Sequence, residues 1–180
     1  MSPSAVEHSA AEHSPEQHSA EQRARELGLA IPDYLDPPYG GRYGGSTLRA
    51  FHRTGDLLEL SGITPESRDG ALLHPGAVGV DITLEQAREA ARYTAVNALG
   101  MIRAALGSLD EVVALSRGLC FVLCPPGFER LNEVSNAASD LLLDVFGPDA
   151  GRMGRASIGA TALSRSACFE LWLSLECRPR

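Results

Sequence analysis

Residues 166–177 read SACFELWLSLEC, and apolar and polar side chains alternate along this stretch. Successive side chains of a strand point to opposite faces of a sheet, so the alternation predicts a strand over about 167–177 with one face in the core. A second strand is predicted over about 156–163, within GRASIGATAL (154–163). A turn near residues 163–166 would join the two strands as a hairpin.

Each of these strands carries one charge in an apolar setting, Arg155 at the start of the first and Glu170 inside the second. Burying a charge costs several kcal/mol unless a partner compensates it. In the expected hairpin, Glu170 would lie opposite residues 159–160, on the order of 13 Å along the strand from Arg155 at ~3.3 Å per residue. Direct pairing within one chain is therefore difficult, and we expect Arg155 to be held for a ligand, with Glu170 facing the same pocket. A structural salt bridge, within one subunit or between two, stays the alternative.

Two helices are predicted between the other strands. The first covers 83–106, because Thr83 and Gln86 form a T-x-x-Q capping box and Gly107 follows the last apolar position. The second runs over about 129–146 and stops at a Gly-Pro pair. Their apolar stripes comprise Ala87, Ala91, Ala98, Ile102 and Leu106 in the first helix, and Val134, Ala138, Leu141, Leu142 and Val145 in the second.

Further strands are predicted over 48–53, 57–61 and 112–124, the first two joined by a TGD turn. This order predicts an α+β fold in which two helices cover one face of a single mixed sheet. The second face carries Glu170 and Trp172 among apolar residues, which suits a subunit interface or a pocket better than open water. We therefore expect an oligomer.

Composition excludes several classes of function. The net charge of the 180 residues is −7, with no basic run, which argues against binding to nucleic acid. All 16 basic residues are arginine, which excludes an internal lysine Schiff base with pyridoxal phosphate and a P-loop lysine. No apolar segment approaches the ~20 residues of a membrane span, and no secretory signal is evident, so we expect a cytoplasmic protein without membrane contact. The four cysteines lie in apolar runs and are predicted to be reduced core thiols.

The first 22 residues contain few large apolar side chains and are predicted to be a disordered tail, leaving 23–180 as the folded domain. A five-residue repeat places His8, His13 and His18 at equal spacing, and this spacing fits neither one face of a helix nor the common spacings of zinc ligands. A weak metal-binding tract is the minor alternative, and no metal site is expected.

Several motifs in this order resemble the Rid family (reactive intermediate deaminases, also called YjgF-like or endoribonuclease L-PSP), in particular a divergent branch of it. They are LSG at 60–62, ARYTAVNALGMIRAALGSLDEVV in and after the first helix, VSNAASDLLLDVFG at 134–147, and RASIGATAL with Glu170 fifteen residues after Arg155. The resemblance covers roughly 25–178. It implies a fold like that of trimeric chorismate mutase, in which three subunits close a barrel with ligand pockets between them.

The resemblance also implies site residues and an activity, the hydrolysis of enamines or imines of amino acids to 2-keto acids and ammonia without a cofactor. It assigns Glu170 and Ser61 to catalysis, and Arg155, Gly62, Asn136 and Ser157 to binding a small carboxylate substrate. The sequence departs from the family at Leu48, where many members have a pocket tyrosine, at Ile63 instead of glutamine, and at Ala156 instead of serine.

Other readings remain open from the residues alone. Ser61 can serve only a turn and Asn136 only a helix contact, and Trp172 is expected to pack in an interface. The protein can be a non-catalytic module that binds a small carboxylate. The family's older name suggests a ribonuclease or translation inhibitor, and the fold suggests a chorismate mutase, although only one cation is placed for that dianionic substrate.

Overall fold

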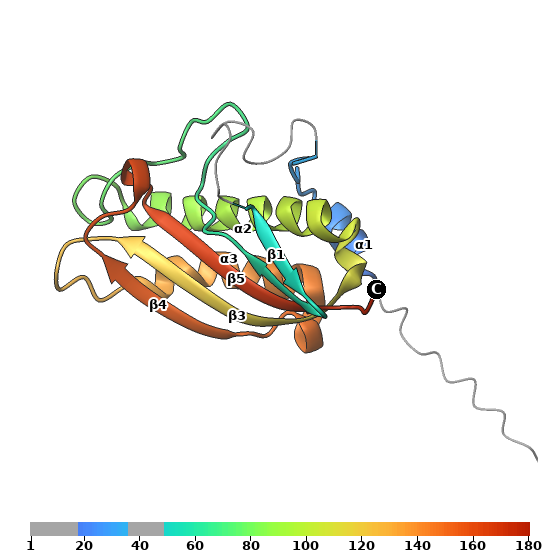
Figure 1. The fold of residues 1–180 in the computed structure, drawn as a ribbon. Coiled ribbons are helices and arrows are strands. Elements are labelled where there is room, and N and C mark those ends of the chain that lie inside the picture. Colours follow the sequence, from blue (N-terminus) through green and yellow to red (C-terminus); the bar gives the residue numbers. More distant parts are fainter. Residues whose placement is uncertain (1–17, 36–48) are drawn as a thin grey trace, which may run out of the picture.

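The computed structural model describes residues 18–35 and 49–180, and it shows one mixed sheet with helices on one face (Figure 1). The strand order is β1-β2-β5-β3-β4, and all neighbouring strands are antiparallel except β3 and β4, which are parallel. The strands are β1 (Phe51–Thr54), β2 (Leu57–Leu60), β3 (Val112–Leu123), β4 (Gly154–Ala160) and β5 (Phe169–Cys177). The predicted α+β class and single mixed sheet are confirmed.

Helices α2 (Leu84–Leu106) and α3 (Leu131–Ala150) cover the sheet and enclose the core. Thr83 and Gln86 form the expected capping box, and Gly107 ends α2 with a left-handed φ of 87°. Nine of the ten predicted stripe residues are buried, with only Leu106 partly exposed. In α3 the helical backbone breaks at Gly147, whose φ is 79°, so the predicted stop at this glycine is confirmed although a further turn follows.

A short helix, α1 (Ala20–Glu26), begins inside the segment predicted to be disordered. Ser19 caps it, accepting a bond from the backbone N–H of Gln22 at 3.2 Å. The carboxylate of Glu21 accepts bonds from both Nε and Nη2 of Arg103 at the end of α2, and α1 therefore docks onto the folded domain. The expected boundary at residue 22 is wrong for residues 19–22, because the Ser19 cap and the Glu21–Arg103 ion pair order this segment despite its polar composition. His8 and His13 lie outside the described residues.

The predicted hairpin between the last two strands is also wrong. β3 lies between β4 and β5, pairing with β4 in parallel and with β5 in antiparallel register. Helix α3 carries the chain from the end of β3 back to the start of β4, which a parallel pair requires. Residues 164–166 form a 3-10 turn on the path from β4 to β5 instead of a tight hairpin turn.

The sheet's second face carries apolar side chains that no helix covers, and we call it the open face. On β3, β4 and β5 this face includes the apolar residues Leu119, Phe121, Ile158 and Trp172. It also includes the polar residues Arg117, Glu170, Ser174 and Glu176. Trp172 is 50% exposed and Ile158 37% exposed. Within residues 18–35 and 49–180, no helix combines the length and apolarity that a membrane crossing needs.

Candidate functional site

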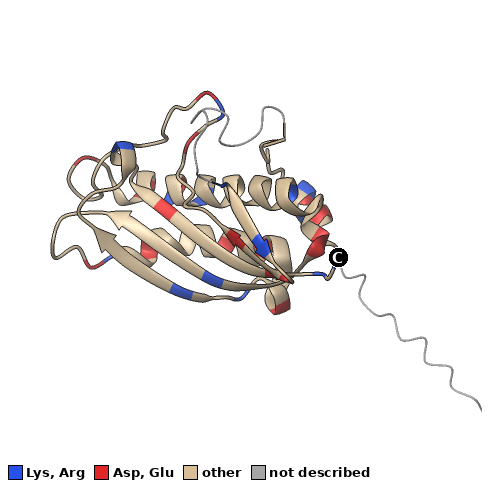
Figure 2. Ribbon diagram, in the orientation of Figure 1, with Lys and Arg blue, Asp and Glu red and all other residues tan. Residues whose placement is uncertain are grey.

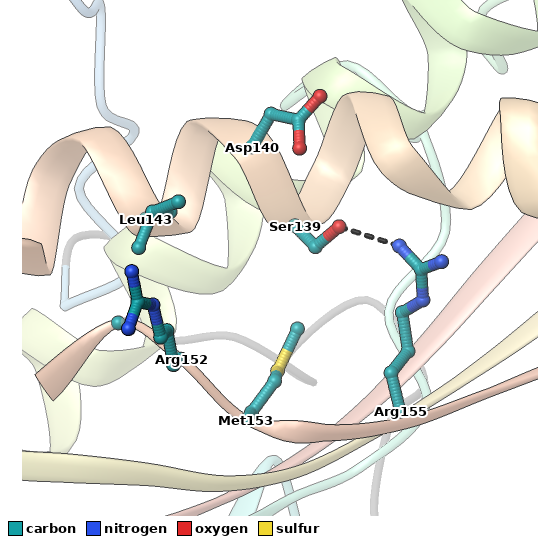
Figure 3. Close-up of a pocket in the computed structure, with 7 residues that line it drawn as sticks. Ser139, Asp140, Leu143, Arg152, Met153 and Arg155 are labelled. Carbon is teal, nitrogen blue, oxygen red and sulfur yellow. Dashed lines mark hydrogen bonds between the residues drawn. The ribbon is translucent and has the colours of Figure 1, made fainter. Parts of the chain in front are cut away.

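Arg155 lies on β4 and points toward the helices. Its register partner on β3 is Gly118, whose partner on β5 is the buried Leu173, so all three positions belong to the helix-covered face. The guanidinium donates from Nη1 to Oγ of Ser139 at 2.6 Å and from Nη2 to Oδ1 of Asn132 at 3.4 Å, both on α3 (Figure 3). Both partners are neutral, so neighbouring dipoles orient the cation without cancelling its charge.

A pocket of about 440 Å³ opens beside this guanidinium, between α3 and the start of β4. Its lining consists of Ser139, Asp140, Leu143, Gly151, Arg152, Met153 and Arg155 (Figure 3). A Cβ at Gly151 would lie 2.7 Å from the carbonyl oxygen of Gly147, so only glycine lets the chain approach α3 this closely. Gly118 likewise leaves space for the Met153 side chain, which forms the floor of the pocket.

Glu170 lies on the open face, in register with Phe121 of β3. Its Oε1 accepts a hydrogen bond from Nε1 of Trp172 at 2.6 Å, and the Trp172 ring packs edge-on against Phe121 with centroids 6.2 Å apart. A Cβ on Gly62 would stand only 2.2 Å from Oε1 of Glu170. Glycine at position 62 therefore provides the space in which this carboxylate lies, and the structure brings Gly62 and Glu170 together.

Arg155 and Glu170 thus lie on opposite faces of one sheet. Arg155 faces α3, whereas Glu170 faces away from the helices. Within the described residues no hydrogen bond or ion pair joins them, and one chain cannot place both in one pocket. The expectation of a shared pocket therefore does not hold within a single chain and requires a second copy.

Ser61 and Asn136, predicted for the site, have other surroundings in the chain. The Ser61 hydroxyl donates to the backbone carbonyl of Arg49, and the backbone N–H of Ser61 donates to the carbonyl of Ala50 at 2.9 Å. Both groups therefore fix the segment before β1. Asn136 is exposed on α3, and Asn132, one helical turn earlier, makes the bond to Arg155 instead. LNEVSN offers two asparagines on one face, and the local sequence alone does not choose between them.

Ser157 lies two residues beyond Arg155 on the same face of β4, and its register partner is the buried Cys120. Its Oγ is buried without a hydrogen-bond partner in the described part of the chain. A polar atom in that state costs free energy unless a ligand or water meets it, so Ser157 remains a candidate for ligand contact.

The four cysteines are buried free thiols, as predicted. Burial raises the pKa of the Cys168 thiol to about 11, and burial also raises the pKa of Cys120 against the opposing effects of a Ser135 hydrogen bond and the Arg155 charge. Thiols with raised pKa values are poor nucleophiles at neutral pH. Across residues 18–35 and 49–180, no group of three His, Cys, Asp or Glu side chains is arranged to hold a metal ion.

Figure 2 shows acidic and basic positions spread over the described elements, with basic positions on β3 and β4 and an acidic position on β5. The basic residues do not gather into a continuous stripe on the described elements.

Comparison with known proteins gives relatives and fold neighbours. The chain is 35% identical over 147 residues to Protein TCP17 of Trypanosoma cruzi, covering 82% of this chain and 87% of that protein. It is 31% identical to Atu1372 of Agrobacterium tumefaciens, a solved structure of unknown function, with a TM-score of 0.75 over 88% of this chain and 91% of that one.

Other solved structures share the fold at lower identity. A "putative endoribonuclease" of Shewanella oneidensis is 24% identical, with a TM-score of 0.78 over 88% of this chain and 99% of that one. A "putative endoribonuclease L-PSP" of Entamoeba histolytica is 15% identical, with a TM-score of 0.52 over 73% of this chain and 88% of that one. No family model matches the sequence.

Proposed function

The chain belongs to the Rid family of YjgF-like (endoribonuclease L-PSP) proteins, and from this membership we propose that it hydrolyses reactive enamines or imines of amino acids to 2-keto acids and ammonia. The observation that carries the proposal is Arg155, a partly buried cation that two neutral side chains orient beside a pocket. An uncompensated guanidinium in such a place favours a ligand carboxylate, which it can bind through two parallel N–H bonds.

The reaction makes modest demands on the protein. The oxygen of a water molecule bonds to the imine carbon, the nitrogen gains protons and leaves as ammonia, and the remaining hydroxyl becomes the carbonyl of the keto acid. Arg155 binds the carboxylate of the substrate. Glu170 accepts a proton from the attacking water and returns one to the nitrogen, and Trp172 holds the carboxylate for that role.

This division of labour requires that two copies of the chain form one site, and we propose a homotrimer. The uncovered open face supports association, because Trp172 and Ile158 expose apolar surface beside Glu170. A neighbouring copy that covers this face can bring its own Arg155 and Ser157 toward Glu170. In such a site Gly62 lies next to the reacting atoms, Ser61 acts through the backbone it fixes, and Asn136 lies at the rim.

A non-catalytic binding module is the second candidate. The specific observation in its favour is that the Ser61 hydroxyl already donates to the carbonyl of Arg49, so this proton is committed to the backbone. The module would keep the carboxylate contact of Arg155 and lack turnover.

The test generates 2-aminoacrylate and other imines with an amino-acid dehydratase or oxidase and measures keto-acid release with and without the protein. We expect acceleration by the wild-type chain and its loss in Arg155→Gln, whereas Arg92→Gln, which removes an exposed arginine of α2, retains it. Ligand binding without acceleration would favour the binding module. Light scattering that gives a monomer at micromolar concentration would refute the shared site, and cleavage of RNA would favour the ribonuclease reading.

A further inference from the structure

The pocket beside Arg155 contains a second cation, Arg152, at its other end. Figure 3 shows Arg152 rising toward Leu143 and Arg155 rising toward Ser139, with Met153 between them. In the part of the chain that the structure describes, Arg152 makes no hydrogen bond and no ion pair, and Arg155 bonds only neutral groups. The guanidinium groups of the exposed Arg152 and the partly buried Arg155 thus line one open pocket without a carboxylate partner.

The one acidic residue of the lining does not neutralise them. Asp140 lies on α3 at the rim, and Figure 3 shows its carboxylate directed away from both arginines. Neither arginine forms an ion pair with it in the described structure. Its charge still disfavours a doubly charged phosphate near Arg152, whereas a carboxylate carries a single charge.

The position of Arg152 is built into the local fold. Gly151 lets the chain approach α3, because a Cβ there would lie 2.8 Å from Cα of Leu143. Leu143, which lines the pocket together with Arg152, lies one helical turn beyond Ser139, which Arg155 contacts. Four helical residues rise about 6 Å, so Ser139 and Leu143 mark two parts of the pocket that lie about one helical turn apart along α3. That separation is comparable to the length of a five-carbon dicarboxylate.

We propose that the ligand of this pocket carries a second carboxylate, which Arg152 binds while Arg155 binds the first. This inference rests on the proposed function and names its substrate class, imines of acidic amino acids. Specificity arises because a monocarboxylate leaves Arg152 hydrated and gains nothing from it, whereas a dicarboxylate gains a second charge-assisted contact with this guanidinium.

Titration calorimetry with glutarate and butyrate tests the inference without turnover. We expect the wild-type protein to bind glutarate at least tenfold more tightly than butyrate. Arg152→Gln should weaken the binding of glutarate at least tenfold more than the binding of butyrate, and Arg155→Gln should weaken the binding of both acids. Arg92→Gln removes the same charge from an exposed site on α2 and should leave the ratio of the two affinities unchanged.

Equal affinities for the two acids, or an unchanged ratio in Arg152→Gln, would overturn the inference. A parallel assay separates it from the proposed function: imines of glutamate and alanine are supplied, and keto-acid release is measured. Hydrolysis of both imines at equal rates, with no preference for glutarate, refutes the dicarboxylate site alone. Preferential glutarate binding through Arg152 without hydrolysis of either imine refutes the deaminase activity and supports the dicarboxylate site.

Discussion

Gly62→Ala is expected to separate catalysis from stability, because its new methyl group meets the Glu170 carboxylate. An ideal Cβ would stand 2.2 Å from Oε1 of Glu170 and 2.7 Å from Nε1 of Trp172. An ordinary contact of a Cβ atom begins near 3.4 Å, so the carboxylate must move by about 1 Å and lose its 2.6 Å bond to Trp172. A displacement of that size in a reacting group costs on the order of 10²-fold in rate.

The cost in stability should be small, because Glu170 can rotate its flexible end into the open face. The lost hydrogen bond is worth about 1 kcal/mol at a half-exposed site. Replacing glycine at a position without positive φ returns about 0.4–1 kcal/mol by restricting the unfolded chain. We therefore expect the free energy of unfolding to change by less than about 1 kcal/mol.

Three measurements check this variant. Urea denaturation gives stability, keto-acid release gives turnover, and the fluorescence of Trp172, the single tryptophan of the chain, reports the loss of its contact with Glu170. Gly154→Ala is the matched control, since its Cβ would lie at an ordinary 3.5 Å from the Ser116 carbonyl oxygen. Unchanged turnover in Gly62→Ala, or destabilisation beyond about 3 kcal/mol, would refute the argument that Gly62 positions a mobile catalytic carboxylate.

Three further predictions concern α1 and α3. Burial opposes ionisation of Glu21, but hydrogen bonds from Arg103 and from the Leu109 N–H outweigh burial and lower the pKa of this carboxyl. The ion pair therefore stabilises the fold above the usual glutamate pKa of about 4.3, and this stabilisation is lost as the pH falls below that value. Glu21→Gln should cost about 1–2 kcal/mol at pH 7 and less at pH 3.5 in urea denaturation; an equal cost at both pH values would contradict this. Deleting residues 1–22 removes Ser19 and Glu21 and should lower the free energy of unfolding by about 2–3 kcal/mol. Deleting residues 1–17 should lower it by less than about 1 kcal/mol. Equal melting temperatures of the two truncated proteins would show that α1 adds nothing to stability. Asn132→Ala should weaken butyrate binding about tenfold in calorimetry by freeing the Arg155 guanidinium, whereas Asn136→Ala should not, and the reverse order would restore the sequence-based assignment.

The fold was predictable where a local signal decides it. The capping box at Thr83 and Gln86 defines α2 because two backbone groups are satisfied within four residues, and the alternation in 169–177 defines β5 because one face must be buried. Strand order needed more than local signals. Sequential strands usually pair, but the α3 crossover places β4 beyond β3, and no residue of β4 or β5 encodes that choice by itself.

The sequence indicates Arg155 as a candidate site residue, but it does not show which residues surround it. Arg155 was identified because a cation at the start of an apolar strand needs an explanation, and the structure places it beside a pocket. Arg152 was missed, since a charged residue in a loop gives no such signal until the close approach of Gly151 to α3 is known. Asn132 was missed in favour of Asn136, because only the register of β4 against α3 distinguishes two asparagines one turn apart.

The opposite faces of Arg155 and Glu170 lead to a quantitative test of the shared site. Arg155 is in register with Gly118 and Glu170 with Phe121, an odd number of residues apart on β3, and side chains alternate between faces along a strand. Only a second copy can therefore bring both groups to one substrate.

We predict that Arg155→Gln and Glu170→Gln are each inactive alone and regain activity when the two variants are co-expressed in equal amounts. If each site takes Arg155 from one copy and Glu170 from its neighbour, random mixing in a closed ring leaves about a quarter of the sites with both native residues. The assay compares keto-acid release by the mixed oligomer with that of the wild type, and mixing after separate purification, where copies do not exchange, is the control. Activity near zero in the co-expressed oligomer, with both variants folded and present in it, would show that the two residues do not act in one site between copies.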